Sequence, residues 1–224
     1  KIDIFATVRK PLLELEKKAN IIYTDLTLEK DWVFLNGIDI VIHLAATQHH
    51  TGKKNANNLF QPLNIESTKE LIQNSIYYNV KKFIFISTIQ VYGENFSKNY
   101  IINEDTALKA KSIYSKSKLN GEIILQNESL KSDMSFIIIR SPLIYGKEAK
   151  GNLEILKNLI VKGIPLPLAN IKNKRHMIHV KNLSNFICEC AFNKQVNNEI
   201  FVVSDNKAIS TSDLIYNLGI ELNK

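Results

Sequence analysis

Five short apolar segments recur along the chain, and they constrain its fold more than any other feature of the sequence. Each is of strand length, rich in Ile, Val and Phe, and without a regular alternation of apolar and polar residues. They are Ile2–Val8, Ile38–Ala46, Lys82–Thr88, Phe136–Arg140 and Glu199–Val203. Such segments are typical of strands buried on both faces, which occur in parallel sheets covered by helices.

Segments with helical periodicity lie between these strands. Asn64–Asn79 places Thr68, Leu71, Ile72, Ser75 and Ile76 on one face. Lys181–Asn193 does the same with Leu183, Phe186, Ile187, Cys190 and Ala191. Because strands and helices alternate, the crossovers between parallel strands should be right-handed. The sequence therefore predicts an α/β fold with a doubly wound, Rossmann-like parallel sheet.

The length of 224 residues suits one large domain with a smaller annex. The character of the sequence changes after Gly146, and two prolines in 163–170 exclude a helix or central strand there. We therefore expect a main domain over residues 1–146 and a smaller substrate-binding region, with returning strand and helix elements, over 147–224.

Composition narrows the class of protein. The hydrophobic fraction of 45% excludes a disordered chain, and the longest apolar runs are too short to cross a bilayer. Cys188 and Cys190, the two cysteines, share an amphipathic helix, so neither a disulfide framework nor a metal site is expected. Without a signal peptide in the sequence, we expect a cytoplasmic protein with no membrane partner.

The net charge of +7 raises the question of nucleic acid. The lysines are scattered along the whole chain rather than gathered in a stripe, which disfavours that partner. A small anionic substrate would need only a few of these charges.

The pair Tyr114 and Lys118 opens a helix predicted to run to about Ser129. Residues four apart share a helical face, so the phenol and the ammonium lie within reach of each other. A neighbouring positive charge favours the phenolate, which turns the tyrosine into an acid–base group. Taken alone the pair is weak evidence, because an exposed Tyr and a solvated Lys at this spacing are common.

The ends of the predicted strands add to this evidence. Thr88 ends one buried strand, and Val41–Ala46 and Phe136–Gly146 end two others in small or hydroxyl-bearing residues. Parallel strands bind ligands at their carboxyl ends, where such residues gather. Several strand ends of this kind, in this order along the chain, indicate a ligand-binding site more specifically than any single one does.

With these motifs, the chain resembles the extended short-chain dehydrogenase/reductases of the NAD-dependent epimerase/dehydratase family over essentially all 224 residues. The resemblance is greatest to the UDP-glucose 4-epimerase-like branch, which includes UDP-sugar 4-ketoreductases. The supporting phrases are Arg140-Ser-Pro-Leu-Ile-Tyr-Gly, Gly163-Ile-Pro-Leu-Pro-Leu, Ile171-Lys-Asn-Lys-Arg and Val203-Ser-Asp-Asn-Lys-Ala-Ile-Ser-Thr.

The resemblance implies a role for each matching residue. Tyr114 would be the catalytic acid–base, Lys118 its partner and a ligand of the nicotinamide ribose, and Thr88 the group that hydrogen-bonds the reacting sugar oxygen. The NAD or NADP cofactor would be held by Arg9, Asp25, Leu26, Leu44, Ala45, Ala46, Tyr114, Lys118 and Pro142. The nucleotide-sugar substrate would be held by Thr88, Asn152 and Arg175. A homodimer is the assembly that the resemblance implies.

One departure from the family is large. The family opens with a strand, a Gly-x-x-Gly-x-x-Gly turn and a helix, and no such glycine cluster occurs here. The segment from Lys1 to Arg9 resembles the second strand of that fold instead. We therefore expect a sheet that lacks its first strand–helix unit, and poor cofactor affinity in the chain as it stands.

The motifs leave the reaction open between two alternatives. A UDP-sugar 4-epimerase removes hydride from carbon 4 and returns it, whereas an NADPH-dependent UDP-4-keto-sugar reductase only delivers it. Arg9 directly follows the first apolar segment. An acidic residue at this strand end would favour NAD, whereas an arginine there can accommodate the 2′-phosphate of NADP. A non-catalytic NAD(P)-sensing module is a third alternative, disfavoured because Thr88, Tyr114 and Lys118 are all present.

Overall fold

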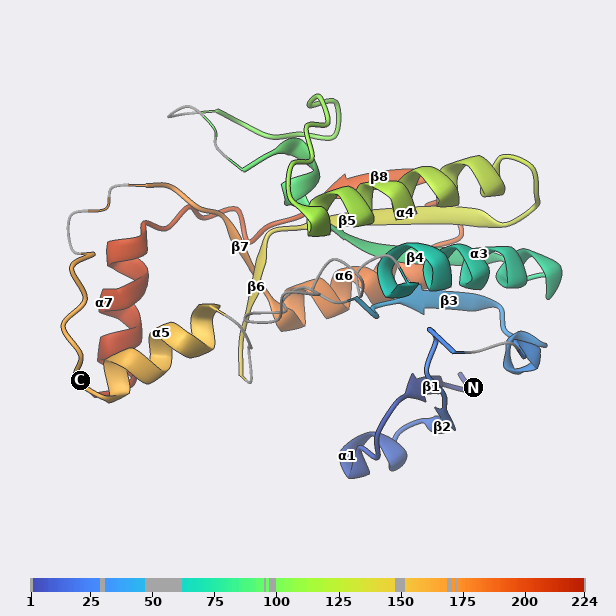
Figure 1. The fold of residues 1–224 in the computed structure, drawn as a ribbon, viewed down its shortest axis with the longest axis horizontal. Coiled ribbons are helices and arrows are strands. Elements are labelled where there is room, and N and C mark those ends of the chain that lie inside the picture. Colours follow the sequence, from blue (N-terminus) through green and yellow to red (C-terminus); the bar gives the residue numbers. More distant parts are fainter. Residues whose placement is uncertain are drawn as a thin grey trace. The chain divides into compact units, whose positions relative to one another are not determined.

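The computed structural model describes residues 2–28, 31–46, 62–94, 96, 100–147, 152–168, 171 and 173–223. Figure 1 labels the helices and strands of the chain, which divides into two compact units. The first comprises Lys1–Phe85 and Ser112–Ile137, and the second Ile86–Lys111 and Ile138–Lys224.

The strands confirm the predicted parallel α/β architecture. A four-stranded sheet has the order β3 (Ile40–His43), β4 (Lys82–Thr88), β5 (Ser135–Ser141) and β8 (Glu199–Val202). β3 and β4 run parallel, with Ile40 beside Lys82 and His43 beside Phe85. β1 (Phe5–Val8) and β2 (Asn20–Tyr23) form a separate parallel pair. All five predicted strands are present, but β1, which was predicted to be buried on both faces, has no buried residue.

The helices of the first unit follow the predicted periodicity. Besides the short α1 (Leu13–Glu16) and the 3₁₀ turn Val33–Leu35, a π-helical segment Pro62–Glu66 leads into α3 (Ser67–Tyr77). α3 buries Thr68, Leu71, Ile72 and Ser75, which lie on its predicted inner face. It packs against α4 (Ile113–Ser129), which begins where the Ser112 hydroxyl accepts a hydrogen bond from the Ser115 amide at 3.2 Å.

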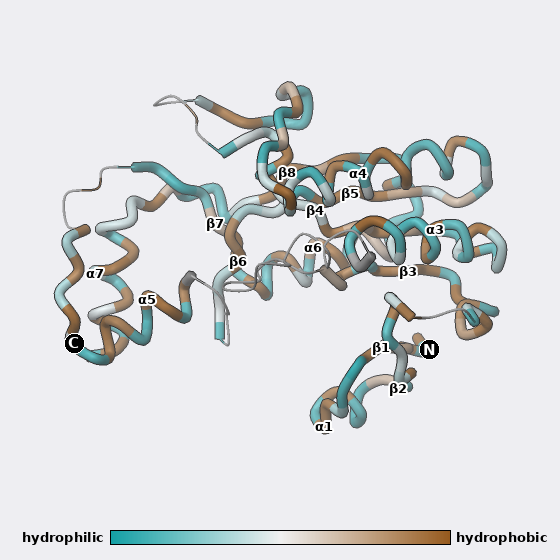
Figure 2. The backbone as a smooth tube through the Cα atoms, in the orientation of Figure 1, coloured by the Kyte–Doolittle hydropathy of each residue, from teal (hydrophilic) through white to brown (hydrophobic). Residues whose placement is uncertain are grey.

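The central strands carry the core. Phe83, Ile84 and Phe85 of β4 and Ile137, Ile138 and Ile139 of β5 are all 0% exposed. Figure 2 shows these strands as apolar along most of their length. Burying each such side chain contributes roughly 1.5–3 kcal/mol to folding, so consecutive burial on both faces fixes these two strands in the interior.

The second unit is built from shorter elements. The 3₁₀ turn Ile89–Tyr92 follows β4, β6 (Leu143–Tyr145) pairs in parallel with β7 (Met177–His179), and α5 (Asn152–Val161) packs against α7 (Thr211–Glu221). α6 (Val180–Phe192) buries Leu183, Ile187, Cys190 and Ala191 and leaves Cys188 exposed, as its amphipathic pattern predicts.

Asp205 joins several of these short elements. Its carboxylate accepts hydrogen bonds from the Tyr145 hydroxyl at 2.8 Å, the His179 amide at 2.9 Å and the Asn182 side chain at 2.7 Å. These bonds lower the pKa of Asp205, that from Asn182 most. One charged acceptor thus holds β6, the start of α6 and the segment after β8 together.

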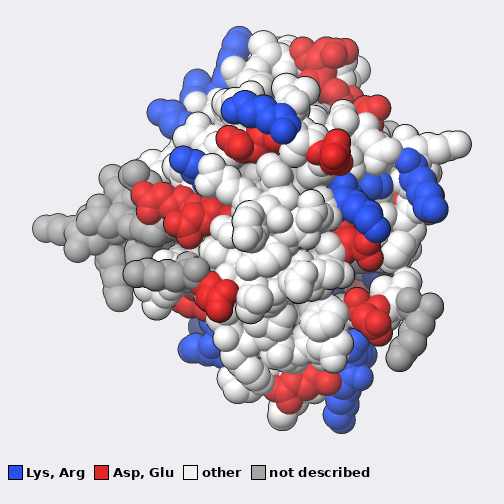
Figure 3. Space-filling view, turned by 90° about the vertical axis from the view of Figure 1, so that its right-hand side faces the viewer, with Lys and Arg blue, Asp and Glu red and all other residues white. Residues whose placement is uncertain are grey.

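Within the residues that the structure describes, no helix is both long and apolar enough to cross a membrane. On the face in Figure 3, basic and acidic side chains are interspersed rather than gathered by sign. The boundary near residue 146 is a division by function, and it stays a prediction.

Candidate active site

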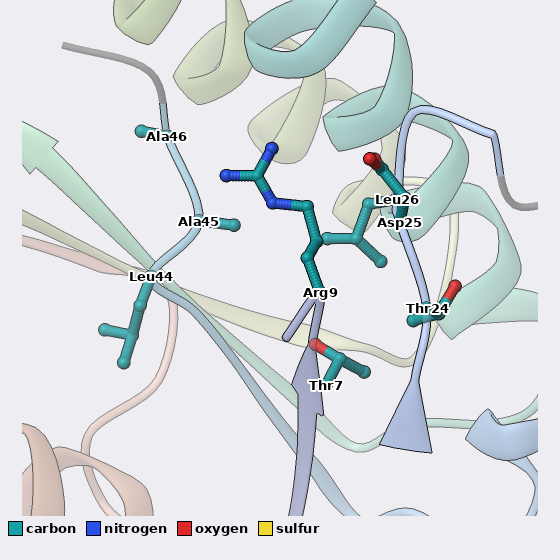
Figure 4. Close-up of a pocket in the computed structure, with 8 residues that line it drawn as sticks. All are labelled: Thr7, Arg9, Thr24, Asp25, Leu26, Leu44, Ala45 and Ala46. Atoms are coloured by element: carbon teal, nitrogen blue, oxygen red, sulfur yellow. The ribbon is translucent and has the colours of Figure 1, made fainter. Parts of the chain in front are cut away.

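A pocket lies at the carboxyl ends of three strands in the first unit (Figure 4). Its volume is about 240 Å³. Thr7 and Arg9 come from the end of β1, three residues follow β2, and three follow β3. The full lining is Thr7, Arg9, Thr24, Asp25, Leu26, Leu44, Ala45 and Ala46. Six of these eight residues were predicted from the sequence to contact the cofactor, and the structure brings them together.

The pocket combines one cation, one carboxylate and a wall of small residues. The Arg9 side chain extends into the space between the Ala45–Ala46 segment and the Asp25–Leu26 segment (Figure 4). Asp25 accepts hydrogen bonds from the Thr27 amide at 3.0 Å and the Thr27 hydroxyl at 2.7 Å. These bonds, with a smaller effect of the Arg9 charge, hold the pKa of Asp25 below its usual value. The pocket therefore offers a fixed acceptor and a guanidinium donor on opposite segments.

The predicted acid–base pair lies on α4 in the same unit. Tyr114 is half-buried in the first turn, and Lys118, one turn later, is 3% exposed. Burial lowers the pKa of Lys118 to about 8, although the charge of Glu122 opposes that shift. A lysine with this pKa carries its proton at neutral pH while exchanging it more readily than a solvated one.

His43 is a buried group that sequence reasoning missed. Its Nε2 lies 3.0 Å from the Thr68 hydroxyl oxygen, and its ring stacks on Phe85 with centroids 5.7 Å apart. Burial, with a smaller effect of the Lys118 charge, lowers the pKa of His43 to about 3. It is therefore a neutral hydrogen-bonding residue at physiological pH. A lone histidine in an apolar strand gave no sign of this contact.

Three further residues, each beside α4 or the pocket, had no signal in the sequence. The Asn64 side chain donates to the Ser117 hydroxyl at 3.1 Å, which connects the π-helical segment to α4. The hydroxyl-bearing Thr7 and Thr24 line the pocket beside the predicted cofactor residues. Only the arrangement of the strands and helices brings Asn64 to α4 and the two threonines to the pocket.

The remaining predicted residues belong to the second unit. Thr88 ends β4 at 7% exposure, and its hydroxyl oxygen accepts a hydrogen bond from the Gln90 amide at 3.3 Å. Pro142 is buried between β5 and β6, whereas Arg175 is exposed and joined through its backbone to Ile209. Asn152 begins α5, and its side chain lies outside the described residues. That these groups meet Tyr114 around one substrate is part of the proposal below.

Among the described residues, no cluster of three or more His, Cys, Asp or Glu side chains is arranged to hold a metal ion.

The parallel α/β sheet with a pocket at its strand ends defines the doubly wound class of nucleotide-binding domains. The chain belongs to the NAD dependent epimerase/dehydratase family, whose model matches residues 3–204. The members of this family are enzymes, and NAD is the cofactor by which it is described.

Individual relatives differ in the reaction they are named for. A UDP-glucose 4-epimerase of Vibrio cholerae is 34% identical over 193 residues, which is 85% of this chain and 59% of the relative. A dTDP-D-glucose 4,6-dehydratase of Dictyostelium discoideum is 34% identical over 161 residues, 67% of this chain and 35% of the relative. The chain thus spans little more than half of the first relative and about a third of the second.

A solved structure supports the fold. The UDP-glucuronic acid 4-epimerase of Bacillus cereus, solved in complex with UDP-glucuronic acid and NAD, superposes with a TM-score of 0.84 at 24% identity. The match covers 95% of this chain and 68% of that one. The predicted doubly wound α/β fold is thereby confirmed.

The buried state of His43 predicts how it titrates. Because its pKa in the folded chain is lowered from 6.5 to about 3, the unfolded chain takes up this proton first as the pH falls. His43 should therefore stay neutral at pH 5, and its contribution to stability should be lost as the pH falls from about 6.5 toward 3. Long-range ¹H–¹⁵N NMR correlations of the imidazole measure this directly. A titration midpoint near 6 would contradict the buried geometry.

Proposed function

We propose that this chain carries the cofactor-binding and acid–base machinery of a UDP-sugar 4-epimerase that uses NAD(P). The observation that carries the proposal is the pair Tyr114 and Lys118 on α4, with Lys118 buried and its pKa lowered to about 8, in the unit that also holds the strand-end pocket. The 34% identity to a protein named UDP-glucose 4-epimerase supports this choice of reaction.

The pocket suits the adenosine part of a dinucleotide. Ala45 and Ala46 leave the backbone open to a flat group, while Asp25 offers an acceptor for an exocyclic amine. Arg9 is placed to hydrogen-bond the ribose or a phosphate on it. The cofactor, when bound, supplies an acceptor and donor of hydride.

Each side chain of the acid–base set has a defined task in the proposed reaction. Tyr114 removes the proton from the 4-hydroxyl of the sugar as the hydride leaves carbon 4, and it returns that proton when the hydride comes back to the other face. The Lys118 ammonium stabilises the phenolate form of Tyr114. Thr88, whose hydroxyl is at the carboxyl end of β4, donates a hydrogen bond to the oxygen that becomes a carbonyl.

The substrate groups complete the proposal. Arg175, exposed near β7, and Asn152 at the start of α5 would hold the diphosphate and nucleotide of a UDP-sugar. Support for their roles comes from the resemblance and from the chemistry of a guanidinium with phosphate oxygens. The expected homodimer and cytoplasmic location rest on the resemblance and on the composition, respectively.

A UDP-4-keto-sugar reductase that consumes NADPH is the second candidate, and Arg9 favours it. β1 ends at Val8 and is followed by two basic residues, Arg9 and Lys10, and Arg9 lines the pocket. A guanidinium at this strand end favours a 2′-phosphate, whereas a carboxylate would favour the free ribose hydroxyl. A preference for NADPH suits a reductase, which uses up the reduced cofactor, better than an epimerase, which regenerates its own.

Replacing Tyr114 with Phe should lower turnover roughly 10²- to 10⁴-fold, because only the proton-transferring hydroxyl is lost. The measurement is the interconversion of UDP-galactose and UDP-glucose with added cofactor. Tyr77→Phe is the matched control, since Tyr77 is 76% exposed on α3. Near-parental turnover by the Tyr114 variant would remove the catalytic assignment.

Cofactor preference tests the role of Arg9. The parent should bind NADP roughly ten- to a hundredfold more tightly than NAD, the contribution of a charge-assisted hydrogen bond to phosphate. Arg9→Asp should reverse that preference, because the new carboxylate repels the 2′-phosphate and can accept a bond from the ribose hydroxyl.

Competitive titration of the two cofactors by calorimetry provides the measurement. Lys10→Asp makes the same change of charge beside the pocket, so it separates a direct contact from a general field effect. A firm NAD preference in the parent would remove the argument for the reductase and leave the epimerase alone.

A further inference from the structure

Lys118 carries a positive charge inside the first unit, and the proposed mechanism does not explain what holds that charge in place. The side chain is 3% exposed. Moving an ammonium group out of water is costly unless neighbouring groups compensate for the lost hydration. The residues around Lys118 should therefore include groups that stabilise it specifically.

The ring of Phe85 is the first of these groups. The Lys118 nitrogen lies 4.4 Å from the centroid of the ring, within the range of a cation–π interaction. Phe85 is 0% exposed, and the stacked imidazole of His43 fixes it further. The ring is therefore a fixed, desolvated partner for the ammonium.

Gly121 explains how the ring comes so close to α4. A Cβ atom at this position would lie 2.8 Å from the Phe85 Cζ atom, closer than such atoms pack. Only a glycine allows the ring to lie against the helix at the turn that carries Lys118. We call Phe85, Gly121 and Glu122 the Lys118 seat.

Glu122 is the second group that compensates for burial. It follows Lys118 by one helical turn on α4, on the same face, and it is 0% exposed. Its charge raises the pKa of Lys118, against the larger lowering caused by burial. No step of the proposed reaction uses this carboxyl group, although burying it is costly in itself.

The other titratable groups near α4 do not replace Glu122. On β3, His43 is neutral at physiological pH, and the Lys118 charge disfavours its protonated form. On the π-helical segment and α3, Glu66, Lys69 and Glu70 are exposed to solvent. On α4 itself, Tyr114 is the proposed reaction partner. Glu122 is thus the buried acid that the structure places near Lys118.

We infer that Phe85 and Glu122 are positioning residues that hold the Lys118 ammonium charged and in place one helical turn after Tyr114, an inference that rests on the acid–base role proposed for that pair. If Glu122 is neutralised, Lys118 loses its proton at a lower pH. The Tyr114 phenolate then loses part of its support at neutral pH.

The decisive experiment measures the pKa of Lys118 by NMR in the chain labelled with [6-¹³C]lysine, without cofactor or substrate. Lys118→Arg assigns the signal by its disappearance. The parent should titrate at about 8, and Glu122→Gln, which keeps the shape of the side chain, should titrate lower. Glu128→Gln is the matched control, because Glu128 lies on the same helix and interacts instead with Lys131. An unchanged Lys118 pKa in Glu122→Gln would overturn the inference.

A second measurement does not require Glu122→Gln to fold. The ring current of Phe85 should displace the Lys118 ε-proton signals upfield in the parent and in Phe85→Tyr, but not in Phe85→Leu. If the Lys118 ε-proton signals of the parent have ordinary chemical shifts, the proposed contact between Lys118 and the Phe85 ring is wrong.

Activity then separates this inference from the proposed function. Glu122→Gln should lower kcat at pH 7 several-fold and shift the alkaline limb of the pH profile to lower pH, with KM for the UDP-sugar unchanged. If the Lys118 pKa is lower in Glu122→Gln than in the parent, but the parent does not turn over UDP-sugars, the proposed function is refuted and the positioning role of Glu122 is supported. If Glu122→Gln turns over UDP-sugars with the same pH profile as the parent, the positioning role of Glu122 is refuted.

Discussion

Burial of β4 on both faces determines where chemistry can occur in this chain. Phe83, Ile84 and Phe85 are fully enclosed, so the middle of the strand has no room for a reactive polar group. The hydroxyl of Thr88 can appear only where the strand ends. Arg9, Asp25 and the Ala45–Ala46 segment also follow their strands and line one pocket, although β1 and β2 are not buried on both faces. The candidate site thus lies at strand ends, where doubly wound sheets bind ligands.

Lys118 departs from this segregation, as do the buried charged residues Glu122 and Arg140. Burying an ammonium group costs free energy that no structural need of α4 explains, since an apolar residue would fill the position. The aromatic face of Phe85 and the charge of Glu122 offset part of that cost. A charged group retained at such a cost one helical turn after Tyr114 supports the acid–base role proposed for that pair.

The sequence predicted the parts of the fold that depend on long-range burial. β4 was predicted with its observed bounds, and α6 within one residue, because continuous apolar runs and an amphipathic repeat identify buried strands and a half-buried helix. β2, a strand of four residues, none of them fully buried, was not predicted, because so short a segment has no periodicity to recognise. Six residues of the pocket were predicted from strand ends and from family resemblance. The contacts of His43, Phe85 and Glu122 were not, because each depends on which side chain another element places against it.

We propose that this chain moves a hydride from carbon 4 of a UDP-sugar and returns it, with Tyr114 transferring the proton and Lys118 stabilising the phenolate. The most direct test is to incubate the protein and its cofactor with UDP-glucose carrying deuterium at carbon 4. We expect UDP-galactose that keeps the deuterium at carbon 4, because the hydride never exchanges with water. Loss of the label to solvent, or no conversion at any cofactor concentration, would contradict it.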